Sequence, residues 1–208
     1  MLTVALTGGI ASGKSVIADV LRRRGCHLDK SDDVAREIMA PDRPAWKKIV
    51  DRFGPAILKS DRSIDRKNLA AIIFKDAAAR RFVDAVVHPL VMKKKKETIA
   101  RLEQEGRVKI FVSEAALTIE AGFAGFFDKV VVAACPEEVQ VQRLMDRDRI
   151  DGEEAWLKVR AQMPADEKLE FADYVVDTSG SMAETIEQAE ELYEELLLDG
   201  RIKNGSPG

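Results

Sequence analysis

The sequence predicts an α/β fold, with a parallel sheet of about five strands flanked by helices. Three observations lead to this prediction. An apolar, β-rich run at Leu2–Leu6 leads through a glycine-rich turn into a helical pattern, and two more apolar runs follow much later, at Val108–Val112 and Val130–Ala134. Uninterrupted apolar runs are typical of strands buried on both faces, and a strand, a turn and a helix in that order begin a parallel sheet.

The remaining strands are shorter. The helix after the first turn stops at Gly25, because glycine readily adopts the left-handed conformation that ends a helix. Cys26–Leu28 is then a weak candidate for the second strand, and Tyr174–Val176 is a short candidate for the fifth.

The stretch between the second and third strands has no strand pattern and is too long for a simple crossover. It predicts a helical insertion that closes over a substrate, with helices at Asp33–Met39, Ala45–Phe53, Arg66–Phe74 and Ala77–Glu105, broken by Pro41, Pro44, Gly54-Pro55 and Pro89. A second helical block is predicted at Glu137–Phe171. The last predicted helix is Ala183–Leu198, followed by a disordered tail.

The turn after the first strand is a phosphate-binding loop. Residues 8–15 match the pattern G-x-x-x-x-G-K-[ST] in full, between a strand and a helix. Glycines let successive backbone N–H groups point at phosphate oxygens, and the helix N-terminus adds its positive end. We expect Lys14 to reach the β- and γ-phosphates of ATP, and Ser15 to give its hydroxyl to Mg²⁺. The residues expected to bind the nucleotide are Gly8, Gly9, Ile10, Ala11, Ser12, Gly13, Lys14, Ser15 and Val16.

Composition sets limits on partners and location. The 208 residues carry a formal net charge of −3, which gives no general attraction to nucleic acid or to an anionic membrane, so neither is expected as a partner. No run approaches the ~20 apolar residues that span a bilayer, and the first residues read as a strand rather than a signal peptide. We expect a cytoplasmic protein, monomeric or weakly homo-oligomeric.

The loop predicts a P-loop NTPase fold but leaves the acceptor open. A guanine-nucleotide switch needs a base-reading motif, and the only lookalike, at 29–32, follows the wrong strand. An ATP-driven machine needs a metal-binding acid after a long strand, which Ser113-Glu114 matches only in part. A small-molecule kinase needs an acceptor-side acid, a closing insertion and an arginine-rich lid, and the chain has a candidate for each. The alternatives are a kinase of another nucleotide-like small molecule and a nucleotide-bound regulatory module.

A wider set of residues accompanies the loop. It comprises Leu6–Ser15, Ser31–Arg36, Phe53-Gly54, Asp65-Arg66, Leu69 with Ile73-Phe74, His88-Pro89-Leu90, Leu117–Glu120, Arg143 with Arg147-Asp148, Arg160-Ala161-Gln162 and Ala172–Asp177. On these residues the sequence resembles the dephospho-CoA kinase family from Thr3 to about Leu198. The resemblance implies that ATP phosphorylates the ribose 3′-hydroxyl of dephospho-CoA, with Mg²⁺ as cofactor, giving CoA and ADP. This is the last step of coenzyme A synthesis.

The resemblance also implies a division of the chain. It predicts a nucleotide-binding core at 1–32, 106–142 and 172–200, a helical CoA-binding domain at 33–105, a lid at 143–171 and a disordered tail at 201–208. The chain departs from the family pattern at two places. Lys30-Ser31-Asp32 stands where the family usually reads Asp-Ala-Asp, and Ala116-Leu117-Thr118 where it usually reads Pro-Leu-Leu.

Asp32 is the candidate for the acid that accepts or orients the proton of the ribose hydroxyl, because it follows the second strand at the carboxyl edge of the sheet. The alternative is a cap for the next helix, a role for which its neighbour Asp33 is also a candidate. Lys30 could pair with Asp32, touch a phosphate or face solvent.

The other site residues group by expected role. Lys14, Arg143 and Arg147 join Asp32 as catalytic candidates, with Arg147 also at the ATP and Glu114 beside Ser15 at the metal. The candidates for substrate binding are Asp32, Arg36, Arg66, His88, Leu117, Glu120 and Arg160. The arginines of the insertion could instead be surface charges. His88 could be a satisfied buried side chain in a kinked helix, and Glu114 could be structural.

Overall fold

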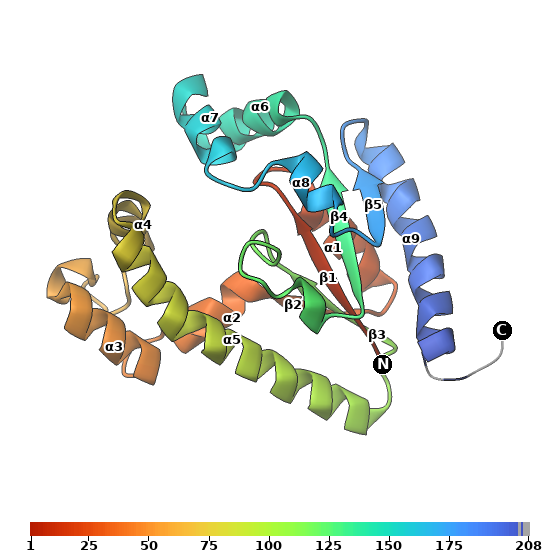
Figure 1. Ribbon diagram of the computed structural model, residues 1–208, viewed down its shortest axis with the longest axis horizontal. Coiled ribbons are helices and arrows are strands. Elements are labelled where there is room, and N and C mark those ends of the chain that lie inside the picture. The colour runs from red at the N-terminus through yellow and green to blue at the C-terminus, as the bar shows by residue number, and fades with distance from the viewer. Residues whose placement is uncertain (204, 206–208) are drawn as a thin grey trace. The chain divides into compact units, whose positions relative to one another are not determined.

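The computed structural model describes residues 1–203 and residue 205, and it confirms the predicted α/β fold (Figure 1). Five strands form one parallel sheet in the order β2-β3-β1-β4-β5. They are β1 Leu2–Gly8, β2 His27–Lys30, β3 Ile110–Glu114, β4 Lys129–Ala134 and β5 Tyr174–Asp177. Since every strand points the same way, all five carboxyl ends lie along one edge of the sheet, where open α/β folds bind ligands.

The strand register aligns specific residues at that edge. Glu114 of β3 pairs with Leu6 of β1 and with Lys30 of β2, while Gly8 of β1 pairs with Ala133 of β4. The end of β1 is therefore flanked by β3 on one side and by β4 on the other. The loop after β1 begins between these two strand ends.

The sheet belongs to a compact unit made of residues 1–30 and the chain from 102 onward. Its helices are α1 Lys14–Arg23, α6 Glu137–Asp148, α7 Gly152–Arg160, α8 Ala165–Leu169 and α9 Met182–Lys203, with a short 3₁₀ helix, η2, at Ala124–Phe126. Helices α1 and α9 pack side by side on the sheet and close its main core (Figure 1). Residues of that core include Val4, Leu6, Ile17, Leu21, Val131 and Leu196.

Residues 31–101 form a second, helical unit. It contains α2 Ser31–Ile38, α3 Pro44–Phe53, the short 3₁₀ helix η1 Pro55–Ile57, α4 Arg66–Lys75 and most of α5, which runs from Ala77 to Glu105. The unit has its own hydrophobic cluster, which includes Trp46, Ile49, Ile57, Leu69, Val83, Val87 and Val91. The helical insertion predicted from the sequence is therefore an independently packed body, and its role in binding substrate stays a prediction.

Four details differ from the sequence expectations. Helix α5 is continuous through Pro89, because Val87 and Val91 on either side are buried in one cluster that offsets the lost hydrogen bond. Helix α2 begins at Ser31, so Asp32 and Asp33 lie in its first turn, where acids favour the helix dipole, rather than at its cap.

The other two differences concern ends of elements. Strand β3 begins two residues later than the apolar run and continues through Ser113, which is buried despite its hydroxyl. Helix α9 runs to Lys203, which contradicts a tail that starts at 201. Lys203 Nζ donates to Met1 O at 3.1 Å and to Asp128 Oδ2 at 2.6 Å, and these bonds anchor the last turn. The rest of the predicted tail lies outside the described residues, apart from residue 205. Within residues 1–203 and 205, no helix is long and apolar enough to cross a membrane.

Candidate active site

The loop between β1 and α1 has the backbone that a phosphate cradle requires. Gly8 and Gly13 have positive φ angles of 147° and 85°, and Gly13 lies directly before the first residue of α1. A Cβ on Gly8 would lie 2.4 Å from Ala133 O, and a Cβ on Gly9 would lie 2.3 Å from Gln140 Oε1. Because real Cβ atoms do not approach a backbone atom so closely, Gly8 requires glycine for reasons of space, whereas a side chain at Gly9 would force the end of Gln140 to move.

The loop lysine is folded back over the loop itself. Lys14 Nζ donates to the carbonyl oxygens of Gly8 and Gly9 at 2.8 and 2.7 Å. Its charge therefore lies over the glycine turn, at the place where the loop's N–H groups and the start of α1 concentrate positive potential. Ser15, the next residue, is exposed in the first turn of α1.

A buried threonine supports the loop from the far side. Thr178 follows β5, is 1% exposed, and donates its hydroxyl to Ser12 O at 2.6 Å and to Ala134 O at 3.0 Å. Arg143 of α6 in turn donates to Thr178 O at 2.6 Å. The structure thus places Arg143, predicted as a lid arginine, against the backbone that holds the phosphate loop.

Helices α6 and α7 cover the loop. Val141, Leu144, Ala155 and Val159 form a small apolar cluster against which Ile10 and Ala11 of the loop pack. Just after α7, Gln162 Oε1 accepts a hydrogen bond from the backbone N–H of Ile10 at 2.7 Å. The predicted lid segment therefore touches the phosphate loop through both apolar and polar contacts.

The other two lid arginines are engaged locally. Arg147 makes two hydrogen bonds to Asp148, at 2.7 and 3.2 Å. Hydrogen bonding to this carboxylate raises the pKa of the Arg147 guanidinium above its usual value. Arg160 lies over the ring of Trp156, 4.6 Å from its centroid, as in a cation–π contact. Neither contact excludes a role at the transferring phosphate, and both roles stay predictions.

An acid and a lysine end the two strands on the other side of the loop. Glu114 ends β3, and Lys30 Nζ of β2 lies 3.9 Å from its Oε2. Lys30 is half exposed, so the lysine that replaces the family's first acid faces another acid at the sheet edge. Asp32 follows the end of β2 by two residues, a reach of at most ~7 Å of extended chain. Asp32 is thus tethered near this edge.

The candidates in the helical unit are exposed or form local pairs. Arg36 lies 3.1 Å from Asp33 in an exposed i,i+3 pair, and His88 Nε2 lies 3.6 Å from Asp84 Oδ1. His88 is only about one-third exposed. Arg66 is the first residue of α4, directly after the N-cap Asp65, and is exposed. The arginine side chains of this unit are accessible to an anionic ligand.

The loop after β3 holds the last two candidates. Leu117 is 39% exposed. Glu120 is mostly buried, and its Oε1 accepts hydrogen bonds from Lys168 Nζ at 2.5 Å and from Met163 N at 3.4 Å. The partner of Glu120 is therefore a buried lysine of α8, and a contact of Glu120 with substrate stays a prediction.

The residues of the phosphate loop fit a nucleoside triphosphate. The turn is closed to a Cβ at Gly8 by the backbone of Ala133, and the ammonium of Lys14 lies within hydrogen-bond distance of the neutral carbonyl oxygens of Gly8 and Gly9. Charged phosphate oxygens are stronger acceptors for an ammonium than peptide carbonyls are. The loop is thus shaped and charged for a polyphosphate.

Comparison with known proteins agrees with this site. A model of the dephospho-CoA kinase family matches residues 2–184. Dephospho-CoA kinase from Moorella thermoacetica is 39% identical over 210 residues, covering 100% of this chain and 99% of the relative. The corresponding protein from Syntrophotalea carbinolica is 41% identical over 197 residues, covering 95% and 93%. The chain belongs to the dephospho-CoA kinase family.

Solved structures give the same assignment. Dephospho-CoA kinase from Campylobacter jejuni superposes with a TM-score of 0.70 at 27% identity, covering 95% of this chain and 98% of that one. Shikimate kinase from Acinetobacter baumannii superposes with a TM-score of 0.51 at 18% identity, which shows a shared fold alone. The P-loop kinase fold predicted from the sequence is therefore confirmed.

The sequence did not predict three residues that lie in or near the support of the phosphate loop. Thr178 could have been found, since it directly follows a strand at the ligand-binding edge. Gln140, which lies against Gly9 and is 4% exposed, carries no local signal within an amphipathic helix. Lys168 stands in the charged run Asp166-Glu167-Lys168, which reads as surface although its side chain is buried.

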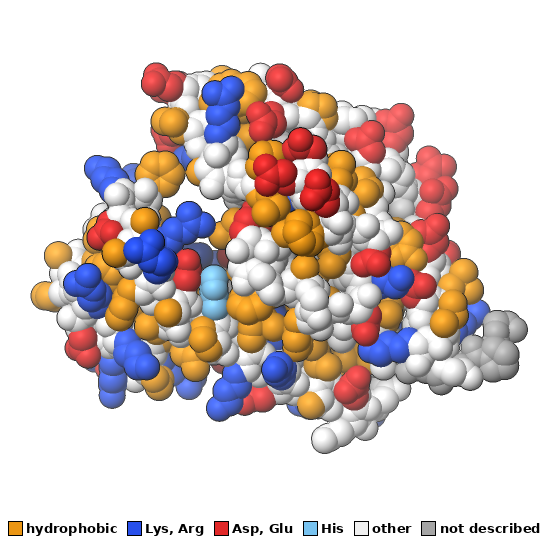
Figure 2. Space-filling view, in the orientation of Figure 1, with side chains coloured by type: hydrophobic (Ala, Val, Ile, Leu, Met, Phe, Trp, Pro, Cys, Tyr) orange, Lys and Arg blue, Asp and Glu red, His pale blue; other side chains and the backbone are white. Residues whose placement is uncertain are grey.

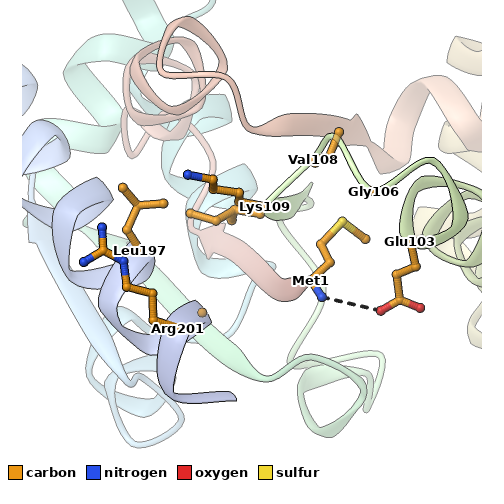
Figure 3. A pocket seen from close by; sticks show the side chains of 9 residues that line it. Met1, Glu103, Gly106, Val108, Lys109, Leu197 and Arg201 are labelled. Atoms are coloured by element: carbon orange, nitrogen blue, oxygen red, sulfur yellow. Dashed lines mark ion pairs between the residues drawn. The ribbon is translucent and has the colours of Figure 1, made fainter. Parts of the chain in front are cut away.

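A cavity of about 420 Å³ lies elsewhere in the sheet unit of this protein (Figure 3). It opens at the amino ends of β1 and β3, the sheet edge opposite the phosphate loop, where the Met1 ammonium lies 3.8 Å from Glu103. Its lining residues are Met1, Glu103, Gly106, Val108, Lys109, Ile110, Leu197, Gly200 and Arg201. None of them belongs to the phosphate loop.

Proposed function

We propose that this chain transfers the γ-phosphoryl group of ATP to the ribose 3′-hydroxyl of dephospho-CoA, with the phosphate loop as the nucleotide site and Asp32 as the acid beside the hydroxyl. Membership of the dephospho-CoA kinase family supports ATP and dephospho-CoA as the two substrates. The observation that carries the proposal is the loop, in which Lys14 lies over a glycine turn whose first glycine has no room for a Cβ.

On the nucleotide side the chemistry is mainly electrostatic. Phosphoryl transfer proceeds by positioning the reactants and neutralising charge, with little covalent work for the protein. The backbone N–H groups of the loop and the start of α1 orient the phosphates. Lys14 exchanges two carbonyl partners for phosphate oxygens and so follows the charge that develops on the transferring group.

Two residues would hold the metal. When bound, Mg²⁺ neutralises charge between the β- and γ-phosphates. Ser15 would give its exposed hydroxyl, and Glu114 would hold a metal-bound water at the end of β3. Within the described residues no group of three or more His, Cys, Asp and Glu side chains gathers as a metal site. In this class of site the phosphates and water complete the coordination.

On the acceptor side we assign Asp32 and the helical unit. Asp32 is tethered within two residues of the end of β2 and accepts or orients the proton of the ribose hydroxyl. Residues 31–101 carry 17 Lys and Arg against 10 Asp and Glu, a net charge of +7, which suits a pyrophosphate-bearing acceptor. Arg36 and Arg66 supply guanidinium groups of the kind that bind phosphate through two hydrogen bonds.

An acceptor panel tests this function. The protein is incubated with ATP and Mg²⁺ plus dephospho-CoA, AMP, CMP, shikimate or no acceptor, and ADP and the phosphorylated product are quantified. We expect rapid ADP release with dephospho-CoA only, and a product that carries the phosphate on the ribose 3′-oxygen. Equal ADP release without acceptor would overturn the kinase assignment. A preference for AMP or CMP would overturn the choice of acceptor.

We extend the proposal to the protein's state in the cell: a monomer or weak homo-oligomer in the cytoplasm, with no nucleic acid or membrane partner. The formal net charge of −3 supports the last point, because the chain as a whole repels polyanions even though residues 31–101 carry a local excess of positive charge. Light scattering after size-exclusion chromatography tests the oligomeric state, and a stable oligomer at micromolar concentration would contradict it.

A further inference from the structure

We propose that Lys168 is a positioning residue for nucleotide binding: it fastens the segment after α7 to the loop after β3 and so holds the phosphate loop in its binding shape. Its side chain is 1% exposed, although it ends in an ammonium group. Lys168 Nζ donates to Glu120 Oε1 at 2.5 Å and to Ala116 O at 3.0 Å. Both acceptors belong to the loop after β3, so a charge of α8 is bound across to a different part of the chain.

The two acceptors lead to two points in the first half of the phosphate loop. Ala116 O also accepts a hydrogen bond from Thr7 Oγ1 at 3.2 Å, and Thr7 is the residue before Gly8. Glu120 Oε1 also accepts a hydrogen bond from Met163 N at 3.4 Å. The residue before Met163 is Gln162, whose Oε1 accepts a hydrogen bond from Ile10 N at 2.7 Å. Lys168 therefore connects to the loop through Thr7 on one side and through Gln162 on the other.

The burial of this pair is not explained by stability alone. A buried ion pair pays a desolvation cost that its attraction barely repays, and apolar residues of similar size are often as stable. Glu120 Oε2 is buried and, within the described residues, has no hydrogen-bond partner, which adds to that cost. Such a pair is best explained by what it holds in place. Here it joins the loop after β3, whose Ala116 carbonyl accepts from Thr7 just before the phosphate loop, to the segment whose Gln162 side chain accepts from Ile10 within it.

The advantage for binding is preorganisation. A loop already held in its bound conformation loses less conformational entropy when the nucleotide arrives. The amide oxygen of Gln162 fixes the Ile10 N–H without adding negative charge next to the phosphates. Loss of Lys168 would free the segment that carries Gln162, and we expect this to weaken nucleotide binding more than it slows the chemical step.

The test measures ADP affinity by calorimetry, without acceptor, together with the melting temperature. In Lys168→Met we expect the Kd for ADP to rise about tenfold, the scale of one lost hydrogen bond, and the melting temperature to fall. In the steady state the KM for ATP should rise by a larger factor than kcat falls. The matched control is Lys158→Met in α7, which removes an exposed pair with Glu154 at 2.8 Å and should change neither quantity.

Two further variants separate positioning from stability. Lys168→Met with Glu120→Gln leaves no buried charge unpaired, so the melting temperature should return toward that of the wild type while the Kd for ADP stays raised. Gln162→Ala should raise the Kd for ADP without lowering the melting temperature. When Gln162→Ala is combined with Lys168→Met, the Kd for ADP should rise little beyond its value in Lys168→Met alone, because both changes remove the same tether.

Three results would overturn the inference. These are a wild-type Kd for ADP in folded Lys168→Met, recovery of affinity together with stability in the double variant, and full additivity with Gln162→Ala. The inference rests on the proposed function for the identity of the nucleotide. Because ADP binding needs no acceptor, a protein that binds ADP but does not phosphorylate dephospho-CoA would refute the proposed function and leave this test valid.

Discussion

The two compact units carry opposite charge and hold their candidate residues in opposite ways. Residues 31–101 have a net charge of +7, whereas the rest of the chain has 16 Lys and Arg against 26 Asp and Glu, a net charge of −10. Figure 2 shows this distribution, with basic side chains spread over the helical unit and acidic ones over the unit that contains α9. The chain's overall charge of −3 hides the contrast.

The contrast in burial is as strong. In the sheet unit Thr178, Gln140 and Lys168 are almost fully buried, and each makes a hydrogen bond to a backbone carbonyl, which for Thr178 is that of Ser12 in the phosphate loop. In the helical unit Arg36 and Arg66 are exposed. In the proposed function the acidic unit binds the nucleotide phosphates through a few directed N–H groups and one lysine, and not through its net charge. In the same proposal the basic unit attracts an anionic acceptor through its overall field and accessible side chains.

The largest expected effect comes from removing the lysine of the phosphate loop, the charged group that the loop directs at the nucleotide. Lys14→Ala should abolish turnover while the fold survives, because it removes a full charge at the transferring group. Loss of even one preorganised donor costs about 10²–10³ in kcat. ADP release measures the effect and circular dichroism confirms the fold. Lys109→Ala, just before β3 at the opposite sheet edge, is the control and should turn over normally. A near-normal kcat in Lys14→Ala would show that the loop does not act as proposed.

The next effect tests the acid that joins the two units in sequence. Asp32→Asn keeps the shape of the side chain but removes its charge, so kcat should fall by roughly 10²–10⁴, the range for a lost general base. The affinity for dephospho-CoA should change little. If Asp32 served only the dipole of α2, Asn would cost about 0.3–1 kcal/mol of stability and leave kcat intact. Full activity would end the assignment, and Asp29 would then be the next candidate.

A smaller effect is expected from removing Thr178, the buried support of the loop, and it can be compared with the loss of a surface ion pair. Thr178→Val keeps the shape but leaves the carbonyls of Ser12 and Ala134 without this donor. The free energy of unfolding should fall by about 1–3 kcal/mol, and ADP should bind more weakly. Lys93→Ala, which removes an exposed pair with Glu97 in α5, should cost under about 1 kcal/mol. Urea denaturation measures both, and equal losses would remove the contrast.

The smallest effect appears only in alkali and concerns the core of the sheet unit. Burial raises the pKa of the Cys26 thiol from 9.0 to about 12. Between these values the folded state keeps a proton that the unfolded chain has lost, so the free energy of unfolding falls as pH rises. Urea titrations at about pH 8 and about pH 10.5 should show a smaller decrease in Cys26→Ala than in the wild type. Identical decreases would contradict the buried-thiol account.

What could be predicted from the sequence follows from how local each signal is. The phosphate loop is a contiguous motif, and the buried strands are apolar runs, so both were predicted and the fold is confirmed. Gln140 and Lys168 act through contacts with residues distant in the sequence, and neither side chain differs locally from a surface residue. The continuity of α5 through Pro89 likewise depends on tertiary packing that outweighs a local breaker.

The central claim is that the nucleotide is bound by the loop of the sheet unit and the acceptor by the helical unit. The most direct measurement is calorimetry of ADP and, separately, dephospho-CoA with Lys14→Ala and with Arg66→Ala. We predict that Lys14→Ala raises the Kd for ADP about tenfold or more and leaves that for dephospho-CoA unchanged, and that Arg66→Ala does the reverse. If both variants weakened the same ligand, the division of binding between the two units would be wrong.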